Sequence, residues 1–234
     1  MKNELVYLYS HPRSGSNFIL ATLYKNFYAG MNLSGNAGVI GHWKHRTNST
    51  GLYHTRKKRV DRNMHSKIFG GHRFRPVKVR NNPIYVIRDG RDVVLSLWRT
   101  KWMLSPDDQD ISFEYFLRKK IDWLGNPGGK LRGKPRMNPV QHWKAHVNNW
   151  YGKKGRDGIC YVRFENMVTN PVKTLKGIKD YFGLKRVSEK LDKIDYLVGW
   201  SPNKGVIGSW KEVFSENDIE FFHKFVPRDY KWIW

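Results

Sequence analysis

The sequence predicts an α/β fold in a single domain over residues 1–234, with a mostly parallel central sheet and helices on both of its faces. Four short apolar segments typical of strands alternate along the chain with longer segments of helical periodicity, and this alternation is characteristic of parallel sheets. The length of 234 residues suits one sizeable core. The 39% hydrophobic and 15% aromatic content argues for a folded globule and against a disordered chain.

The predicted elements follow one another along the whole chain. The first strand covers residues 5–10, and the helix after it covers residues 18–28, with Leu20, Leu23, Tyr24 and Phe27 on one face. The second strand covers residues 67–72, and the third covers residues 84–89 after an Asn-Asn-Pro turn signal. The later elements are helices from Asp92 and over residues 113–123 and 140–151, a buried strand over residues 160–165, a helix over residues 172–182 ending at Gly183, and a helix over residues 217–225.

Two segments are predicted to be loops over the functional site. Residues 34–62 are rich in Gly, His, Asn and basic side chains, and residues 125–136 are rich in Gly and Pro with positive charges only. Long loops in a compact domain are usually either functional or disordered. We expect the two loops to line a substrate pocket next to the functional site. The aromatic side chains of Trp98, Trp102 and Trp143 are expected to line the same pocket.

Polar side chains follow each predicted strand. These positions are residues 13–16, His72, Arg88 and Glu165, in the order of the four strands. Ligands of open parallel sheets bind at the carboxyl ends of the strands. The sequence therefore predicts that these four positions meet in one site.

The first of these positions is an anion-binding turn, the anion loop (residues 12–17, Pro-Arg-Ser-Gly-Ser-Asn). A strand, a turn of small residues and a helix N-terminus together present unpaired backbone N–H groups and a positive dipole end. Gly15 allows close backbone approach, Ser14, Ser16 and Asn17 offer hydrogen bonds, and Arg13 adds charge. The turn differs from the nucleotide-triphosphatase P-loop, which needs a Gly-Lys-Ser/Thr step. An ordinary N-cap of Ser and Asn is the alternative interpretation.

The third strand carries a second pattern. Arg88 stands at its end, and Ser96 follows eight residues later inside the next helix. Pairing of Arg88 with Asp89 or Asp92 alone would be a structural explanation. The occurrence of both patterns in this order favours a functional one.

Together these motifs resemble the PAPS-dependent sulfotransferases, where PAPS is 3′-phosphoadenosine 5′-phosphosulfate. Residues 12–18 resemble the family's 5′-phosphosulfate loop, and Arg88 with Ser96 resembles its 3′-phosphate motif. The segment RFENMVTNP resembles the family's Tyr-Glu-Asp step followed by Asn-Pro, and NKGVIGSWKEVF resembles its Arg-Lys-Gly and Gly-Asp-Trp-Lys segments. The resemblance runs from about Tyr7 to about Phe225 and implies a P-loop-like sulfotransferase architecture.

The resemblance also implies a role for each matching residue. Arg13, where the family usually has Lys, would neutralise the transferring sulfuryl group, and Ser14, Gly15, Ser16 and Asn17 would bind the 5′-phosphate. Phe18, in place of the family's Trp, and Phe164 would contact adenine. Arg88, Ser96, Lys204 and the backbone of Gly205 would bind the 3′-phosphate, while Asn203 replaces an Arg of the family pattern. The product would be 3′,5′-ADP.

The reaction is expected to need a general base for the acceptor, and His suits neutral pH. Among nine histidines, His72 stands where the family places its base, although Gly70 and Gly71 precede it in place of the family's Lys-Thr. His11 and His42 are the alternatives. No metal is expected, because the histidines lack metal-ligand spacing with Cys or carboxylates.

The charge of +23, from 43 Lys and Arg against 20 Asp and Glu, favours anionic partners. The acceptor is predicted to be a small hydroxylated molecule or a saccharide. The positive charge of the protein is compatible with an anionic acceptor. A non-catalytic polyanion- or nucleic-acid-binding protein, a kinase on a related fold, and an inactive nucleotide-binding relative remain alternatives.

The lone Cys160 is expected in the core. Without a secretory signal or a membrane-length apolar run, a soluble cytoplasmic protein is expected.

Overall fold

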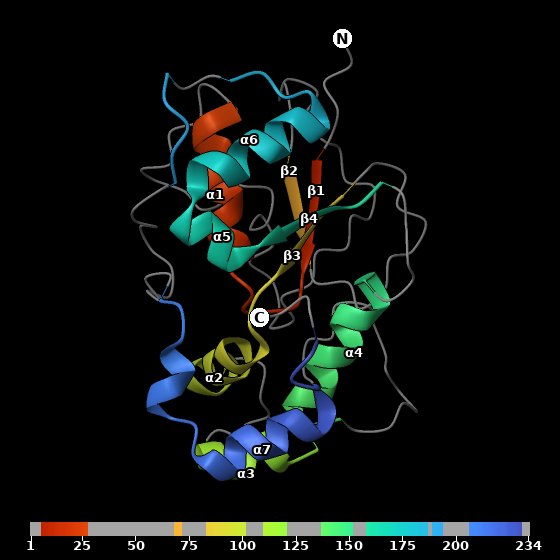
Figure 1. The fold of residues 1–234 in the computed structure, drawn as a ribbon, viewed down its shortest axis with the longest axis vertical. Coiled ribbons are helices and arrows are strands. Elements are labelled where there is room, and N and C mark those ends of the chain that lie inside the picture. Colours follow the sequence, from red (N-terminus) through yellow and green to blue (C-terminus); the bar gives the residue numbers. More distant parts are fainter. Residues whose placement is uncertain are drawn as a thin grey trace.

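A four-stranded parallel sheet forms the centre of the molecule (Figure 1). The computed structural model describes residues 6–27, 68–71, 83–101, 110–120, 137–151, 158–186, 189–193 and 206–230. The strands are β1 (Val6–Ser10), β2 (Ile68–Gly71), β3 (Ile84–Ile87) and β4 (Cys160–Arg163), in the spatial order β2-β1-β3-β4. The predicted α/β class with a parallel sheet is confirmed, and the single domain over the whole chain stays a prediction.

The register brings the carboxyl ends of the strands to one edge of the sheet. Tyr9 pairs with Gly71, Ser10 pairs with Val86, and Ile87 pairs with Arg163. The residues that follow β1, β3 and β4 therefore start from neighbouring points, as the strand-end rule predicts.

The helices begin and end at recognisable caps. Asn170 caps α6 by accepting a hydrogen bond from Lys173 N–H, and Gly183 ends that helix in the left-handed conformation. Ser215 and Asp218 form a capping box at the start of α7. The helices are α1 (Ser16–Phe27), α2 (Gly90–Thr100), α3 (Phe113–Arg118), α4 (Pro139–Tyr151), α5 (Phe164–Thr169), α6 (Pro171–Phe182), the 3₁₀ helix η3 (Ser209–Glu212) and α7 (Glu216–Phe225).

Helices cover both faces of the sheet, as predicted. On one face, Leu8, Val86 and Val162 pack in a single core with residues of α1, α5 and α6. On the other face, Tyr85 stacks on Trp150 of α4 with ring centroids 4.9 Å apart. A further core joins α2, α3, α4 and α7, which Figure 1 shows together beyond the carboxyl edge of the sheet.

Some details of these elements differ from the prediction. The fourth strand is an edge strand rather than a buried one, because β4 pairs only with β3 among the described strands, and Tyr161 is 37% exposed. That strand ends at Arg163 rather than at residue 165, since α5 begins at Phe164. Helix α3 ends at Arg118 rather than at residue 123, because Lys119 takes an extended conformation. Cys160 is half-buried against the core, and burial raises its pKa to about 11.

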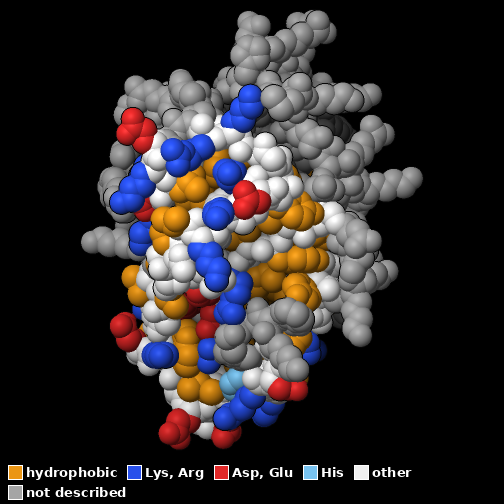
Figure 2. All heavy atoms as spheres, turned by 45° about the horizontal axis from the view of Figure 1, so that its top comes forward, with side chains coloured by type: hydrophobic (Ala, Val, Ile, Leu, Met, Phe, Trp, Pro, Cys, Tyr) orange, Lys and Arg blue, Asp and Glu red, His pale blue; other side chains and the backbone are white. Residues whose placement is uncertain are grey.

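Basic side chains are spread over the molecule. Figure 2 shows Lys and Arg scattered among apolar side chains across one face, consistent with the net charge of +23. Within the described residues, every helix is too short or too polar to cross a membrane.

Candidate active site

The anion loop connects β1 to α1 through a strained backbone turn. Arg13 has a φ of 68° and Gly15 a φ of 85°, so both lie in the left-handed region. Ser14 N–H donates to His11 O at 3.2 Å and closes the turn. A Cβ at Gly15 would lie 2.3 Å from the ring of Phe164, so the turn requires glycine for both conformation and space.

Arg88, the residue directly after β3, binds the anion loop. It is 4% exposed, and its Nη1 donates to Arg13 O at 3.2 Å. Its Nη2 donates to Val206 O at 3.0 Å, and its Cζ lies 4.6 Å from the centroid of the Phe164 ring. One guanidinium thereby joins the loop after β1, the start of α5 and the segment that follows Gly205.

Ser96 closes the same cluster from α2. Its Oγ accepts a hydrogen bond from Arg13 Nε at 3.1 Å, so the two predicted phosphate motifs are in direct contact. Phe18 packs edge-on against Phe164, with centroids 5.8 Å apart. The structure brings together the predicted Arg13, Ser14, Gly15, Phe18, Arg88, Ser96 and Phe164, and it places Ser16 and Asn17 in the first turn of α1.

The two arginines place concentrated positive charge in a partly dry environment. Burial, together with the positive charge of Arg88, lowers the pKa of Arg13 to about 10. Burial also lowers the pKa of Arg88, while Asp92 opposes that shift. Asp92 Oδ2 lies 3.7 Å from Arg88 Nη2, whereas none of the described carboxylates pairs with Arg13.

Among the buried polar side-chain atoms without a hydrogen-bond partner in the described part of the chain, two belong to the anion loop and its arginine. They are Ser14 Oγ in the loop and Arg88 Nε behind it. Buried polar groups normally have partners. Unused donors next to two cationic groups fit an anionic ligand such as a phosphate or a phosphosulfate.

Asp92 organises the C-terminal part of the site, which the sequence did not reveal. Its carboxylate accepts hydrogen bonds from Gly208 N at 2.8 Å, Ser209 Oγ at 3.1 Å and Trp210 N at 3.1 Å. Asp92 therefore attaches residues 208–210 to α2, the helix that carries Ser96. The spacing of four residues between Arg88 and Asp92 was the available signal, and it predicted only an ion pair.

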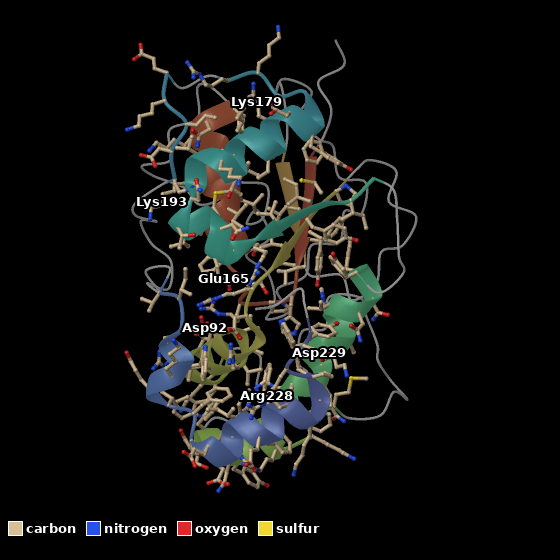
Figure 3. The ribbon with its side chains drawn as sticks, viewed as in Figure 1. Asp92, Glu165, Lys179, Lys193, Arg228 and Asp229 are labelled. Carbon is tan, nitrogen blue, oxygen red and sulfur yellow. The ribbon has the colours of Figure 1, made fainter. Side chains whose placement is uncertain are left out.

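Glu165 joins α5 to the start of α2. Its Oε1 accepts a hydrogen bond from Asp89 N–H at 2.8 Å, and burial raises its pKa. Figure 3 labels Glu165 and Asp92 near the carboxyl edge of the sheet, one from each of the two helices. Glu165 thus fixes the helix start that follows Arg88.

Several predicted residues lie outside the described part of the chain. These are His72, Trp102, Asn203, Lys204, Gly205 and the two loops over residues 34–62, which include His42, and 125–136. Of the neighbouring described residues, Gly71 belongs to β2, and Val206 O accepts a hydrogen bond from Arg88.

The described aromatic side chains that were predicted to line an acceptor pocket pack in or against the core. Trp143 is fully buried in the core between α2, α4 and α7, where its ring would lie 2.7 Å from a Cβ on Gly90. Trp98 packs against Phe113 and donates its Nε1–H to Ile111 O. Helical periodicity cannot distinguish an aromatic side chain that faces a core from one that faces a ligand.

His11 forms a contact that sequence spacing could not reveal. Its Nε2 lies 3.0 Å from Nδ1 of His142, which is 131 residues away on α4, and its Nδ1 lies 2.7 Å from Pro12 O. Both ring nitrogens are thus engaged, so His11 is a poor candidate for the base that takes a proton from an acceptor. Across the residues that the structure describes, no group of three or more His, Cys, Asp or Glu side chains is arranged to hold a metal ion.

Comparison with known proteins identifies the family. The family model described as the sulfotransferase domain matches residues 4–198. The chain belongs to the sulfotransferase family. The recognition from the anion loop and from Arg88 with Ser96 is therefore confirmed.

The curated relatives of this sulfotransferase are distant. Sulfotransferase 1B1 of Mus musculus is 26% identical over 164 residues, which cover 59% of this chain and 50% of the relative. Sulfotransferase 2A1 of Rattus norvegicus is 24% identical over 169 residues, covering 60% and 54% of the two chains. The chain spans about half the length of the curated relatives it matches.

Solved sulfotransferase structures share the fold over nearly the whole chain. Mouse sulfotransferase SULT7A1 complexed with PAP has a TM-score of 0.57 and 17% identity, and covers 96% of this chain and 84% of its own. Retinol dehydratase in complex with androsterone and inactive cofactor PAP has a TM-score of 0.56 and 13% identity. The match covers 97% of this chain and 80% of the retinol dehydratase chain. These similarities confirm the predicted P-loop-like sulfotransferase architecture.

Proposed function

We propose that this protein transfers a sulfuryl group from PAPS to a hydroxyl or amine of an acceptor molecule. The observation that carries the proposal is that Arg88, which follows β3, and Ser96 of α2 both contact Arg13 of the anion loop. A protein that binds polyanions through surface charge alone has no need of this buried arrangement, with Arg88 only 4% exposed.

The donor site would be divided between the two motifs. Ser14, Gly15, Ser16 and Asn17 would hold the 5′-phosphate, while Arg88 and Ser96, with Lys204 and Gly205, would hold the 3′-phosphate. Phe18 and Phe164, which pack edge-on, would contact adenine. PAPS would supply the activated sulfuryl group.

The protein's own contribution to the reaction is charge and positioning. Arg13 stays cationic at neutral pH even with its pKa lowered to about 10, so it offsets negative charge at the 5′ end of the donor. Fixed cationic donors in a water-poor site stabilise developing negative charge without reorganisation. His72, which follows β2, would take the proton of the acceptor.

The acceptor is proposed to be a small hydroxylated molecule or a saccharide. The charge of +23 is compatible with an anionic acceptor. Retinol dehydratase, which has the same fold, was solved with androsterone and with retinol. An acceptor panel should therefore include a steroid, a retinoid, a phenol and an anionic oligosaccharide.

The proposal is tested by measuring 3′,5′-ADP release from PAPS with each acceptor, for the wild type and for His72→Ala. The wild type should release product with at least one acceptor. His72→Ala should lose about 10²- to 10⁴-fold in turnover, the usual contribution of a general base, while still binding 3′,5′-ADP. Full activity in His72→Ala would assign the base elsewhere, and nucleotide binding without any transfer by the wild type would favour an inactive relative.

A further inference from the structure

His11 lies at the junction between β1 and the anion loop. It is 1% exposed, and its backbone oxygen accepts the Ser14 N–H that closes the turn. Its ring contacts the loop on one side through Pro12 O and α4 on the other side through His142. The side chain therefore connects the anion loop to a helix that carries none of the proposed ligands.

The hydrogen bonds determine which nitrogens carry protons. A carbonyl oxygen only accepts, so Nδ1 of His11 must donate to Pro12 O. In a neutral ring, Nε2 is then an acceptor, and Nδ1 of His142 must donate to it. The His142 donor thus selects the His11 tautomer whose Nδ1–H reaches the loop.

The surroundings of the two rings keep them in a dry environment. His142 is 4% exposed, and His11 packs edge-on against both His142 and His146, with centroids 5.1 and 5.2 Å apart. Tyr85 of β3 approaches from the sheet, with its hydroxyl 2.8 Å from Nδ1 of His146. Burial lowers the pKa of His142 to about 3, which agrees with a neutral donor ring.

The loop needs such support because of the backbone at Arg13. A φ of 68° is unfavourable for a residue with a side chain and persists only when surrounding contacts enforce it. Pro12 O belongs to the peptide group that precedes Arg13, and Arg13 O accepts from Arg88. Both peptide groups of Arg13 are therefore held from outside the loop.

We propose that His142 is a positioning residue for the anion loop: through His11, it fixes the Pro12 carbonyl and holds Arg13 in its left-handed conformation. The role in anion binding rests on the proposed function. The His11–His142 pair would reduce the conformational entropy that the anion loop loses on ligand binding. This is the general benefit of preorganisation.

Three variants test the proposal through the dissociation constant for 3′,5′-ADP. His142→Leu removes the donor and should weaken binding about tenfold. His142→Asn keeps an amide donor close to the position of Nδ1 and should bind within about threefold of the wild type. His223→Leu is the matched control, because His223 also contacts a carbonyl, Val226 O, but lies on α7. It should bind like the wild type.

The outcomes separate positioning from packing. Unchanged binding by His142→Leu, or equal losses in His142→Leu and His142→Asn, would overturn the proposal. Nitrogen NMR of the wild-type histidines without nucleotide gives an independent answer: Nδ1 of His11 should carry the proton and Nε2 should not. The opposite tautomer would refute the proposal even if His142→Leu failed to fold. Failure of the wild type to bind 3′,5′-ADP would instead count against the proposed function, and the NMR result would still decide the tautomer.

Discussion

The contact between Gly15 and Phe164 gives a sharp prediction about the anion loop. In Gly15→Ala, the new Cβ would lie 2.3 Å from Phe164 Cδ2 and 2.4 Å from Cε2, well below van der Waals contact. Overpacking of this kind costs about 1–3 kcal/mol, and the φ of 85° adds about 1–2 kcal/mol. We therefore expect the free energy of unfolding to fall by about 2–5 kcal/mol.

A double-mutant cycle separates the clash from the backbone strain. Phe164→Ala alone should cost about 3–5 kcal/mol, as truncations of buried Phe do. In Gly15→Ala with Phe164→Ala, the clash is gone, so the double variant should be about 1–3 kcal/mol more stable than the sum of the single effects predicts. Only the conformational cost at residue 15 should remain.

Urea unfolding of the four proteins, followed by circular dichroism, measures these free energies. Gly177→Ala is the matched control, because Gly177 lies inside α6, where a Cβ added at this position would have no neighbouring atom within 4 Å. It should stabilise the protein by about 0.5–1 kcal/mol. Additivity of the Gly15 and Phe164 effects within about 0.5 kcal/mol would show that the ring does not press on the loop.

The remaining predictions concern charge and protonation. Asp92→Ala should lower the free energy of unfolding by about 3–5 kcal/mol, because it unpairs buried Arg88 and releases residues 208–210. For the same reason it should weaken 3′,5′-ADP binding. Asp110→Ala breaks an exposed ion pair with Lys101 and should change the free energy of unfolding by less than about 1 kcal/mol. Because the folded pKa of His142 is about 3 against 6.5 unfolded, the unfolded chain binds more protons between these values, and stability falls as the pH drops. Between pH 7 and pH 5, His142 alone should lower the free energy of unfolding by about 2 kcal/mol. This loss should be absent in His142→Asn. Equal pH dependence of urea unfolding for the wild type and His142→Asn would contradict a neutral buried His142. Since Arg13 and Arg88 supply the positive charge, we also expect transfer to survive EDTA, and a loss of turnover restored by a divalent cation would show otherwise.

The sequence was most informative where local chemistry determines structure. Gly183 marked the end of α6, and the small residues of the anion loop marked its turn through residue type alone. Arg13 and Arg88 could be assigned to one site because parallel strands place their carboxyl ends together.

The contacts that the sequence did not reveal join residues that are distant along the chain. His11 and His142 are separated by 131 residues, and Asp92 reaches Trp210 across 118. No periodicity connects such positions, since their contact depends on how α2 and α4 pack beyond the sheet. For the same reason, Trp143 could not be placed in the core from its helical spacing alone.

The central claim is that Arg88 and Ser96 form part of a specific 3′-phosphate site beside the anion loop. Calorimetric titration with 3′,5′-ADP and with 5′-ADP at near-physiological salt tests it most directly, with Arg88→Ala as the test variant. Arg118→Ala is its control, because Arg118 pairs with Asp218 between α3 and α7. Arg88→Ala should lose the preference for 3′,5′-ADP. Each charge-assisted hydrogen bond to the 3′-phosphate contributes about 1.5–3 kcal/mol, so 3′,5′-ADP should bind at least about tenfold more tightly in the wild type and in Arg118→Ala. Equal affinities for the two nucleotides, or preference only for a short oligonucleotide, would contradict the claim and leave a general anion site on a basic protein.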